Sequence, residues 1–86
     1  MYNENMNIKV EIYSEKLLNK SIEISQFLDH YNGNEDQRNE LDKIRKELNI
    51  AHREVKIYPE EKKFEEWDDL ITAADGLLIR TGIGLH

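Results

Sequence analysis

The apolar residues of this chain recur at two different spacings, and this change of period constrains the fold more than any other feature. In residues 8–13 and 52–58, apolar and polar residues alternate, as in a half-buried strand. In the segments after each of these, apolar residues recur every three or four positions, as on one face of a helix. A short apolar run at residues 77–79 is typical of a strand covered on both faces. The spacing therefore predicts three strands.

Three helices are expected between these strands. Ser14 is placed to cap the first helix, which ends at Asn32-Gly33. Asn34 is placed to cap the second helix, and the third follows Pro59, which ends the second strand. The third helix is expected to run from about Glu60 to Ala74. The residues expected to form the buried stripes of the helices are Leu17, Leu18, Ile24, Phe27, Leu28, Tyr31, Leu41, Ile44, Leu48, Phe64, Trp67, Leu70 or Ile71, and Ala74.

The resulting order, β-α-α-β-α-β, predicts an α/β fold with a small three-stranded, mainly parallel sheet and three helices. The strand order stays open at this point. Strands in chain order would leave one sheet face exposed, whereas the third strand in the middle would place helices on both faces. We expect a single α/β domain over residues 8–81, a flexible N-terminal segment at 1–7 and a C-terminal tail at 82–86.

Composition narrows the possible functions. The 86 residues include 12 Lys and Arg against 18 Asp and Glu, for a net charge of −6, which disfavours binding to nucleic acid. The chain has no cysteine, which excludes disulfides, thiolate catalysis and cysteine-ligated metals. No apolar run approaches the roughly 18 residues of a membrane span, and residues 1–7 lack the features of a signal peptide. We therefore expect a cytoplasmic protein that does not bind membranes.

No residue pattern indicates catalysis. Ser14, Ser21 and Ser25 lie in or beside a predicted helix, and none stands in a Gly-x-Ser-x-Gly turn. The three histidines share no spacing typical of metal ligands. We therefore expect no enzymatic activity, no catalytic residue, no metal site and no cofactor.

Acidic residues are dense in the predicted helices. Residues 60–69 contain six acids and two lysines, and the simplest interpretation is a solvated helix face. The functional interpretation is a small acidic protein-binding module, an inhibitor or adaptor that presents acidic helices to a basic protein partner. Trp67 is expected to pack inward or to anchor that interface. The predicted partner-binding residues are Asn34, Glu35, Asp36, Glu40, Glu61, Glu65, Trp67 and Asp68.

Two other interpretations use the end of the chain. Ligands of open parallel sheets bind beyond the carboxyl ends of the strands, so Thr81, Gly82 and Gly84 could hold a phosphorylated metabolite or nucleotide in a small regulatory domain. Alternatively, an unpaired edge strand or the C-terminal tail, with Ile83 and Leu85, could form a homodimer.

Overall fold

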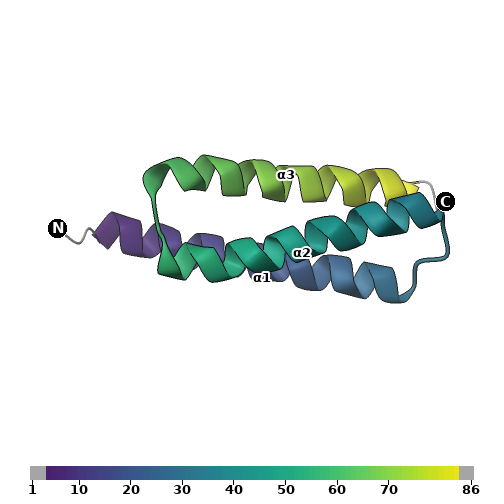
Figure 1. The fold of residues 1–86 in the computed structure, drawn as a ribbon, viewed down its shortest axis with the longest axis horizontal. Helices are drawn as coiled ribbons and strands as arrows, with labels where there is room; N and C mark the ends of the chain where they lie inside the picture. The colour runs from purple at the N-terminus through teal and green to yellow at the C-terminus, as the bar shows by residue number, and fades with distance from the viewer. Residues whose placement is uncertain (1–3, 84–86) are drawn as a thin grey trace.

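A computed structural model describes residues 4–83 and contains three long helices. They are α1 (Glu4–Asp29), α2 (Glu35–Ile57) and α3 (Glu61–Ile83). Short connections join them, so neighbouring helices run antiparallel. Figure 1 shows an elongated three-helix bundle, and its extents are 50 × 17 × 16 Å.

The predicted α/β fold is wrong, because residues 4–83 contain helices and no strand. The alternation at residues 8–13 arises from two opposite sides of α1. Val10 is half-buried in the bundle, whereas Ile8 and Ile12 are 58% and 44% exposed. With no strand in this part of the chain, a homodimer through an edge strand loses its basis.

The other two predicted strands are wrong for the same reason. Val55 is fully buried in α2, while Ile57, two positions later, is 63% exposed. In α3, burial decreases from Leu77 through Leu78 to Ile79, so the apolar run turns from the core to the surface. The helix passes through Gly76 without ending and continues to Ile83. Residues 82 and 83 thus belong to α3, and the rest of the predicted tail, at 84–86, lies outside the described residues.

Burial in all three helices recurs with alternating steps of three and four residues, which is the spacing of a coiled-coil seam. Ser14 and Ser21 occupy two of these seam positions in α1 and are 5% and 4% exposed. Polar residues at seam positions interrupt the apolar stripe, which explains why the helical period of α1 is hard to recognise from the sequence. The buried hydrophobic core consists of Leu17, Ile24, Leu41, Leu48, Ala51, Val55, Phe64, Trp67, Ala74 and Leu77.

The loop between α1 and α2 is held by local polar contacts. Asn34 caps α2 as the sequence predicts, because its side-chain oxygen accepts a hydrogen bond of 2.6 Å from the Asp36 amide. The buried Tyr31 places its hydroxyl 2.8 Å from Gln37 Oε1 and 3.1 Å from the Asn34 carbonyl oxygen. The Tyr31 ring packs so closely on Gly33 that a Cβ at that position would collide with it. A side chain at position 33 would have to displace the Tyr31 ring, which favours glycine at this turn.

Candidate protein-binding surface

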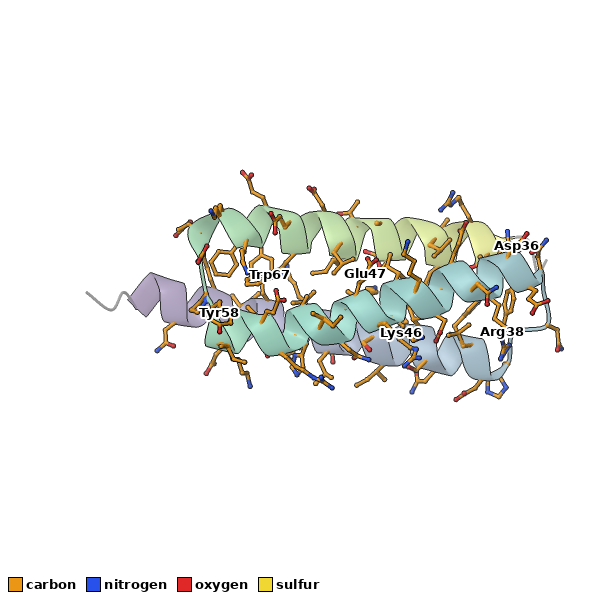
Figure 2. All side chains as sticks on the ribbon, viewed as in Figure 1. Asp36, Arg38, Lys46, Glu47, Tyr58 and Trp67 are labelled. Carbon is orange, nitrogen blue, oxygen red and sulfur yellow. The ribbon has the colours of Figure 1, made fainter. Side chains whose placement is uncertain are left out.

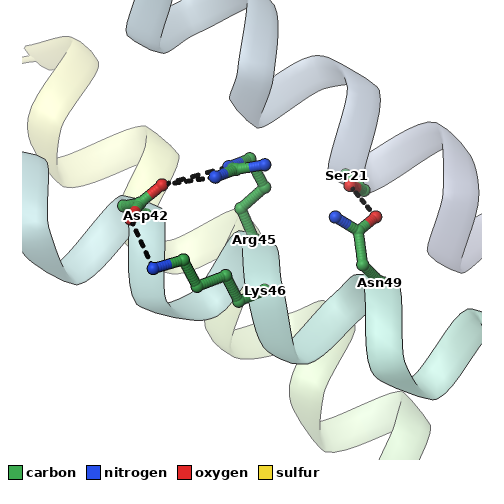
Figure 3. Close-up of polar contacts among 5 residues, drawn as sticks. All are labelled: Ser21, Asp42, Arg45, Lys46 and Asn49. Carbon is green, nitrogen blue, oxygen red and sulfur yellow. Dashed lines mark hydrogen bonds and ion pairs between the residues drawn. The ribbon is translucent and has the colours of Figure 1, made fainter.

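Two buried polar side chains, Ser14 and Ser21, lie in the seam between α1 and α2. The Ser21 hydroxyl donates a hydrogen bond of 2.6 Å to Asn49 Oδ1, as Figure 3 shows. Two turns away along α1, Ser14 Oγ lies 3.3 Å from His52 Nδ1, which in turn lies 3.0 Å from the Ser14 carbonyl oxygen. The small serine side chains allow α1 and α2 to approach each other more closely than either approaches α3.

The contact between Ser14 and His52 does not form a nucleophile and base. A carbonyl oxygen only accepts hydrogen bonds, so the 3.0 Å contact is a hydrogen bond only in the tautomer that carries the proton on His52 Nδ1. In that tautomer Nδ1 cannot take a proton from the serine hydroxyl, and in either tautomer Ser14 is almost completely buried. The pair therefore stabilises the helix–helix seam.

The predicted phosphate site lies at the C-terminal end of α3. Thr81 is buried, and its hydroxyl donates a hydrogen bond of 2.8 Å to the Leu77 carbonyl oxygen. Gly82 belongs to the last turn of α3, and Gly84 lies outside the described residues. The C-terminus of a helix carries partial negative charge, which repels a phosphate. The strand on which the phosphate interpretation depended is not present in the described residues, because residues 77–83 belong to α3.

Neither a metal centre nor a membrane span is evident in the part of the chain that the structure describes. Residues 4–83 contain no group of three or more His, Asp or Glu side chains arranged to hold a metal ion. None of the three helices, as described, combines the length and the apolar character needed to cross a bilayer.

The eight predicted partner-binding residues separate into two groups at opposite ends of the bundle. Asn34, Glu35, Asp36 and Glu40 lie at the start of α2, and the other four lie at the start of α3. Because α2 and α3 are antiparallel, their starting residues are far apart along the 50 Å axis (Figure 1). Figure 2 shows this separation for Asp36 and Trp67. One compact partner surface cannot include both groups.

The group at the start of α2 has a structural role. Asn34 is used as the cap, and Glu35 and Asp36 lie in the first turn of the helix. Acidic side chains there interact favourably with the positive end of the helix dipole. All of these residues, and Glu40, are exposed.

In the group at the start of α3, Trp67 belongs to the core. It is 4% exposed and packs against Phe64 in an edge-to-face arrangement, with ring centroids 5.3 Å apart. Tyr13 of α1 completes the aromatic cluster, 4.9 Å from the Phe64 ring. Trp67 therefore holds α3 on the bundle and is not available as a surface anchor.

Asp68 and Glu61 connect the start of α3 to α1. The Tyr13 hydroxyl donates a hydrogen bond of 2.7 Å to Asp68 Oδ2. This hydrogen bond, with partial burial and the negative charge of Asp68, raises the pKa of Tyr13 to about 12. Glu61 lies 3.8 Å from Lys9 Nζ, but the Glu61 side chain is 72% exposed, so this ion pair is weak.

Two acids that the sequence analysis did not single out, Glu66 and Asp69, belong to the same surface. The charge run at 60–69 contains both, but only the helical spacing assigns them to the exposed side of α3. Together with Glu65 they make no ion pair within residues 4–83. We call the resulting surface the acidic face of α3; it consists of Glu61, Glu65, Glu66, Asp68 and Asp69.

Some acids elsewhere in the bundle are paired with cations at short range. Burial lowers the pKa of Lys20, but hydrogen bonds and charge attraction from Asp75 and Glu23 outweigh it and raise that pKa above its ordinary value. On α2, Asp42 accepts hydrogen bonds from Arg45 and lies 3.2 Å from Lys46 Nζ (Figure 3). Hydrogen bonds from Arg45 and then Lys46 hold the pKa of Asp42 below its ordinary value. Most acids on the acidic face of α3 have no such cation beside them within residues 4–83.

The chain matches no protein-family model, and neither the curated proteins nor the solved structures include a significant match to it.

Proposed function

We propose that this chain is a non-enzymatic protein-binding module that presents the acidic face of α3 to a basic partner, as an inhibitor or adaptor. The observation that carries the proposal is the clustering of five exposed carboxylates on the first turns of one helix. Three of the five, Glu65, Glu66 and Asp69, have no cationic partner within residues 4–83.

The spacing of these acids makes a basic partner favourable. Glu61, Glu65 and Asp69 follow one another at intervals of four residues, so neighbouring carboxylates on the helix repel each other. Of the two lysines in this stretch, Lys62 is exposed and Lys63 lies 3.7 Å from Glu54 of α2. Lysines or arginines of a partner would relieve the repulsion. The net charge of −6 would also accelerate the encounter with a basic protein.

The other candidate surfaces have weaker support. At the start of α2, Asn34 and the acids of the first turn already stabilise the helix end. At the end of α3, Thr81 is buried and the helix terminus disfavours a phosphate. On the acidic face of α3, Glu61 lies in the first turn of its helix, and Glu61 and Asp68 contact α1, whereas Glu65, Glu66 and Asp69 lie beyond the first turn and make no ion pair within residues 4–83.

The experiment compares two variants that carry the same change of charge. The probe is a synthetic lysine-rich helical peptide, and its affinity is measured by isothermal titration calorimetry at low salt. We expect Glu65→Lys with Asp69→Lys to weaken binding about tenfold or more, because two attractions are replaced by two repulsions. Glu35→Lys with Glu40→Lys, at the other end of the bundle, should change the affinity much less.

Salt concentration supplies the second part of this test. Binding through exposed carboxylates should weaken steeply as salt is added, since dissolved ions screen the attraction between exposed charges of the two molecules. Equal losses in the two variants, or an affinity that does not respond to salt, would rule out the acidic face of α3 as the binding surface. Circular dichroism melts of both variants confirm that they are folded.

We further propose a cytoplasmic location for the module. The support is compositional, since a chain of 86 residues without cysteine gains nothing from an oxidising compartment. Fluorescence microscopy of a tagged chain in its host checks this, and signal outside the cytoplasm would contradict it.

A further inference from the structure

The connection between α1 and α2 contains the one asparagine of this chain that is followed by glycine. Asn32 and Gly33 lie between the two helices, and both residues are exposed. The side-chain amide carbon of an asparagine and the backbone nitrogen of the next residue can close a five-membered ring. Most residues hinder this approach with their Cβ, whereas glycine has none. The pair therefore combines a reactive carboxamide with the least hindered backbone nitrogen.

Neither reacting group is held by a hydrogen bond within residues 4–83. The Asn32 carboxamide has no partner there, and the Gly33 N–H donates to no acceptor. The other polar groups of this loop are engaged, since Asn34 caps α2 and the Tyr31 hydroxyl donates a hydrogen bond to Gln37 Oε1. Asn32 and Gly33 are therefore free to approach each other as the loop moves.

Two other exposed asparagines lie in helices and are protected there. Asn19 lies in α1 and Asn39 lies in α2. In a helix, the N–H of the following residue donates to the carbonyl oxygen four residues before it, and both asparagines precede a residue that has a Cβ. Ring closure at these positions would require the helix to open locally. The structure thus distinguishes Asn32 from Asn19 and Asn39.

We propose that Asn32 is a site of spontaneous deamidation, which converts it to aspartate and isoaspartate through a cyclic imide with Gly33. The Gly33 nitrogen loses its proton to solvent and bonds to Asn32 Cγ, and the Cγ–Nδ2 bond then breaks, so that ammonia leaves with a proton from solvent. Water adds to one of the two carbonyl carbons of the ring, and the bond from that carbon to the Gly33 nitrogen breaks. Addition at Cγ gives aspartate, whereas addition at the main-chain carbonyl carbon gives isoaspartate. Each conversion consumes one water molecule and releases one ammonia molecule.

Isoaspartate would disturb the loop more than aspartate. In isoaspartate the main chain runs through the side-chain carbons, so it is one atom longer between Tyr31 and Gly33. The Tyr31 ring packs so closely on Gly33 that no room exists for a Cβ there. The longer chain should therefore shift the ring and weaken its hydrogen bonds with Asn34 and Gln37. Aspartate keeps the chain length, and either product changes the net charge from −6 to −7, beside the acids in the first turn of α2.

This modification does not depend on the proposed function. Figure 1 shows the loop between α1 and α2 at the end of the bundle opposite the start of α3. The acidic face of α3 is therefore remote from Asn32. Deamidation should leave the affinity of that face for the lysine-rich peptide nearly unchanged, because exposed charges so far apart are largely screened. Deamidation and binding can each fail without the other.

The first test is incubation of the wild-type chain for a series of times at two mildly alkaline pH values, followed by peptide mapping with mass spectrometry. Asn32 should convert at least about tenfold faster than Asn19 or Asn39 of the same sample, a difference in barrier of about 1.4 kcal/mol or more. The rate at Asn32 should rise with pH, because the deprotonated Gly33 nitrogen is the nucleophile. An Asn32 carboxamide that persists through the series, or equal rates at the three asparagines, would overturn the proposal.

Two variants identify the reacting residue and its products. Asn32→Gln is the matched control, since it keeps a carboxamide but would have to close a larger ring, and it should gain no acid in this loop over the same times. Asn32→Asp supplies the aspartate product directly. A protease that cleaves before aspartate and not before isoaspartate separates the two products, and thermal melts compare their stability. We expect isoaspartate in the aged wild type and a melting temperature below that of Asn32→Asp. Equal conversion of Asn32→Gln, or an aged wild type without isoaspartate, would contradict the cyclic imide with Gly33.

Discussion

α1 and α3 both pack on α2, but they differ in which side chains they bury. α3 turns Phe64 and Trp67 into the core and carboxylates to the surface. α1 buries apolar residues too, but it also turns Ser14 and Ser21 into the seam with α2 and leaves isoleucines such as Ile12 exposed. In the part of the chain that the structure describes, α1 therefore carries more exposed apolar side chains than α3, and α3 carries the denser group of exposed carboxylates.

The largest expected effect is on the inner side of α3. Trp67→Ala should lower the free energy of unfolding by about 3–5 kcal/mol, because it removes a buried aromatic side chain and leaves a cavity. Ile12→Ala, on the exposed side of α1, should change it by about 0.5 kcal/mol or less in dilute solution. Urea denaturation measures both. Similar losses of unfolding free energy in the two variants would contradict the burial of Trp67 in the core and the exposure of Ile12.

At Ser21 the inner side of α1 holds a small side chain against α2. Ser21→Leu should lower the free energy of unfolding by about 1–3 kcal/mol, because a larger side chain at this buried position has to displace its neighbours. It also removes the hydroxyl that donates to Asn49. Asn19→Leu, at an exposed position of the same helix, is the control and should be nearly neutral in thermal melts. A Ser21→Leu variant as stable as the wild type would show that the seam is not tightly packed.

Tyr13 of α1 donates a hydrogen bond to Asp68 of α3, and this bond makes the contact between the two helices sensitive to pH. The pKa of Tyr13 is raised from 10.0 to about 12 in the folded chain. A raised pKa favours folding while the tyrosine is protonated, so this contribution is complete below pH 10 and is lost as pH rises through about 12. Tyr13→Phe should remove this part of the pH dependence and lower stability at neutral pH by about 0.5–1.5 kcal/mol. Urea denaturation at a series of pH values checks this, and an unchanged alkaline profile in Tyr13→Phe would contradict it.

The smallest expected change in stability comes from substituting two glycines, Gly76 inside α3 and Gly33 at the turn before α2. Gly76 lies inside α3, and a Cβ there would have no atom within 4 Å. Gly76→Ala should therefore raise the free energy of unfolding by about 0.5–1 kcal/mol. Gly33→Ala should do the reverse, because its Cβ would collide with the Tyr31 ring. Thermal melts of the two variants measure the opposite signs, and a loss of stability in Gly76→Ala would indicate that α3 is interrupted at that residue.

The contrast between α1 and α3 also explains which parts of the fold could be predicted from the sequence. The core residues of α3, Phe64, Trp67 and Ala74, follow a helical period, and the structure confirms them as buried. The cap at Asn34 depends on local chemistry and is confirmed too. These features are determined by neighbours within one or two turns of the chain.

The strand at residues 8–13 could not be rejected from the sequence, because α1 has apolar residues on both its inner and outer sides. Ile8, Val10 and Ile12 alternate along the chain although they point to different sides of a helix. The helical stripe that would have corrected this interpretation is interrupted by Ser14 and Ser21. Their burial depends on contacts with α2, and the spacing of residues within α1 does not reveal those contacts.

The charge run at residues 60–69 identified the acidic residues of the candidate site on α3, but it did not show which acids of the chain share one surface. Glu65 and Asp68 lie on the acidic face of α3 as expected for an exposed helix side. Their distance from Asp36 follows from the antiparallel arrangement of α2 and α3, which the predicted sheet concealed. The separation of two acidic surfaces is a property of the bundle as a whole.

The most direct measurement is a map of backbone amide chemical shifts of the wild-type chain, recorded with the lysine-rich peptide at low and at high salt. We predict that the peptide changes the shifts of residues 61–69 of α3 and leaves those of residues 35–40 of α2 unchanged. Added salt should abolish these changes. Changes that centre on residues 35–40, or changes that salt does not affect, would contradict the assignment of the binding surface to the acidic face of α3.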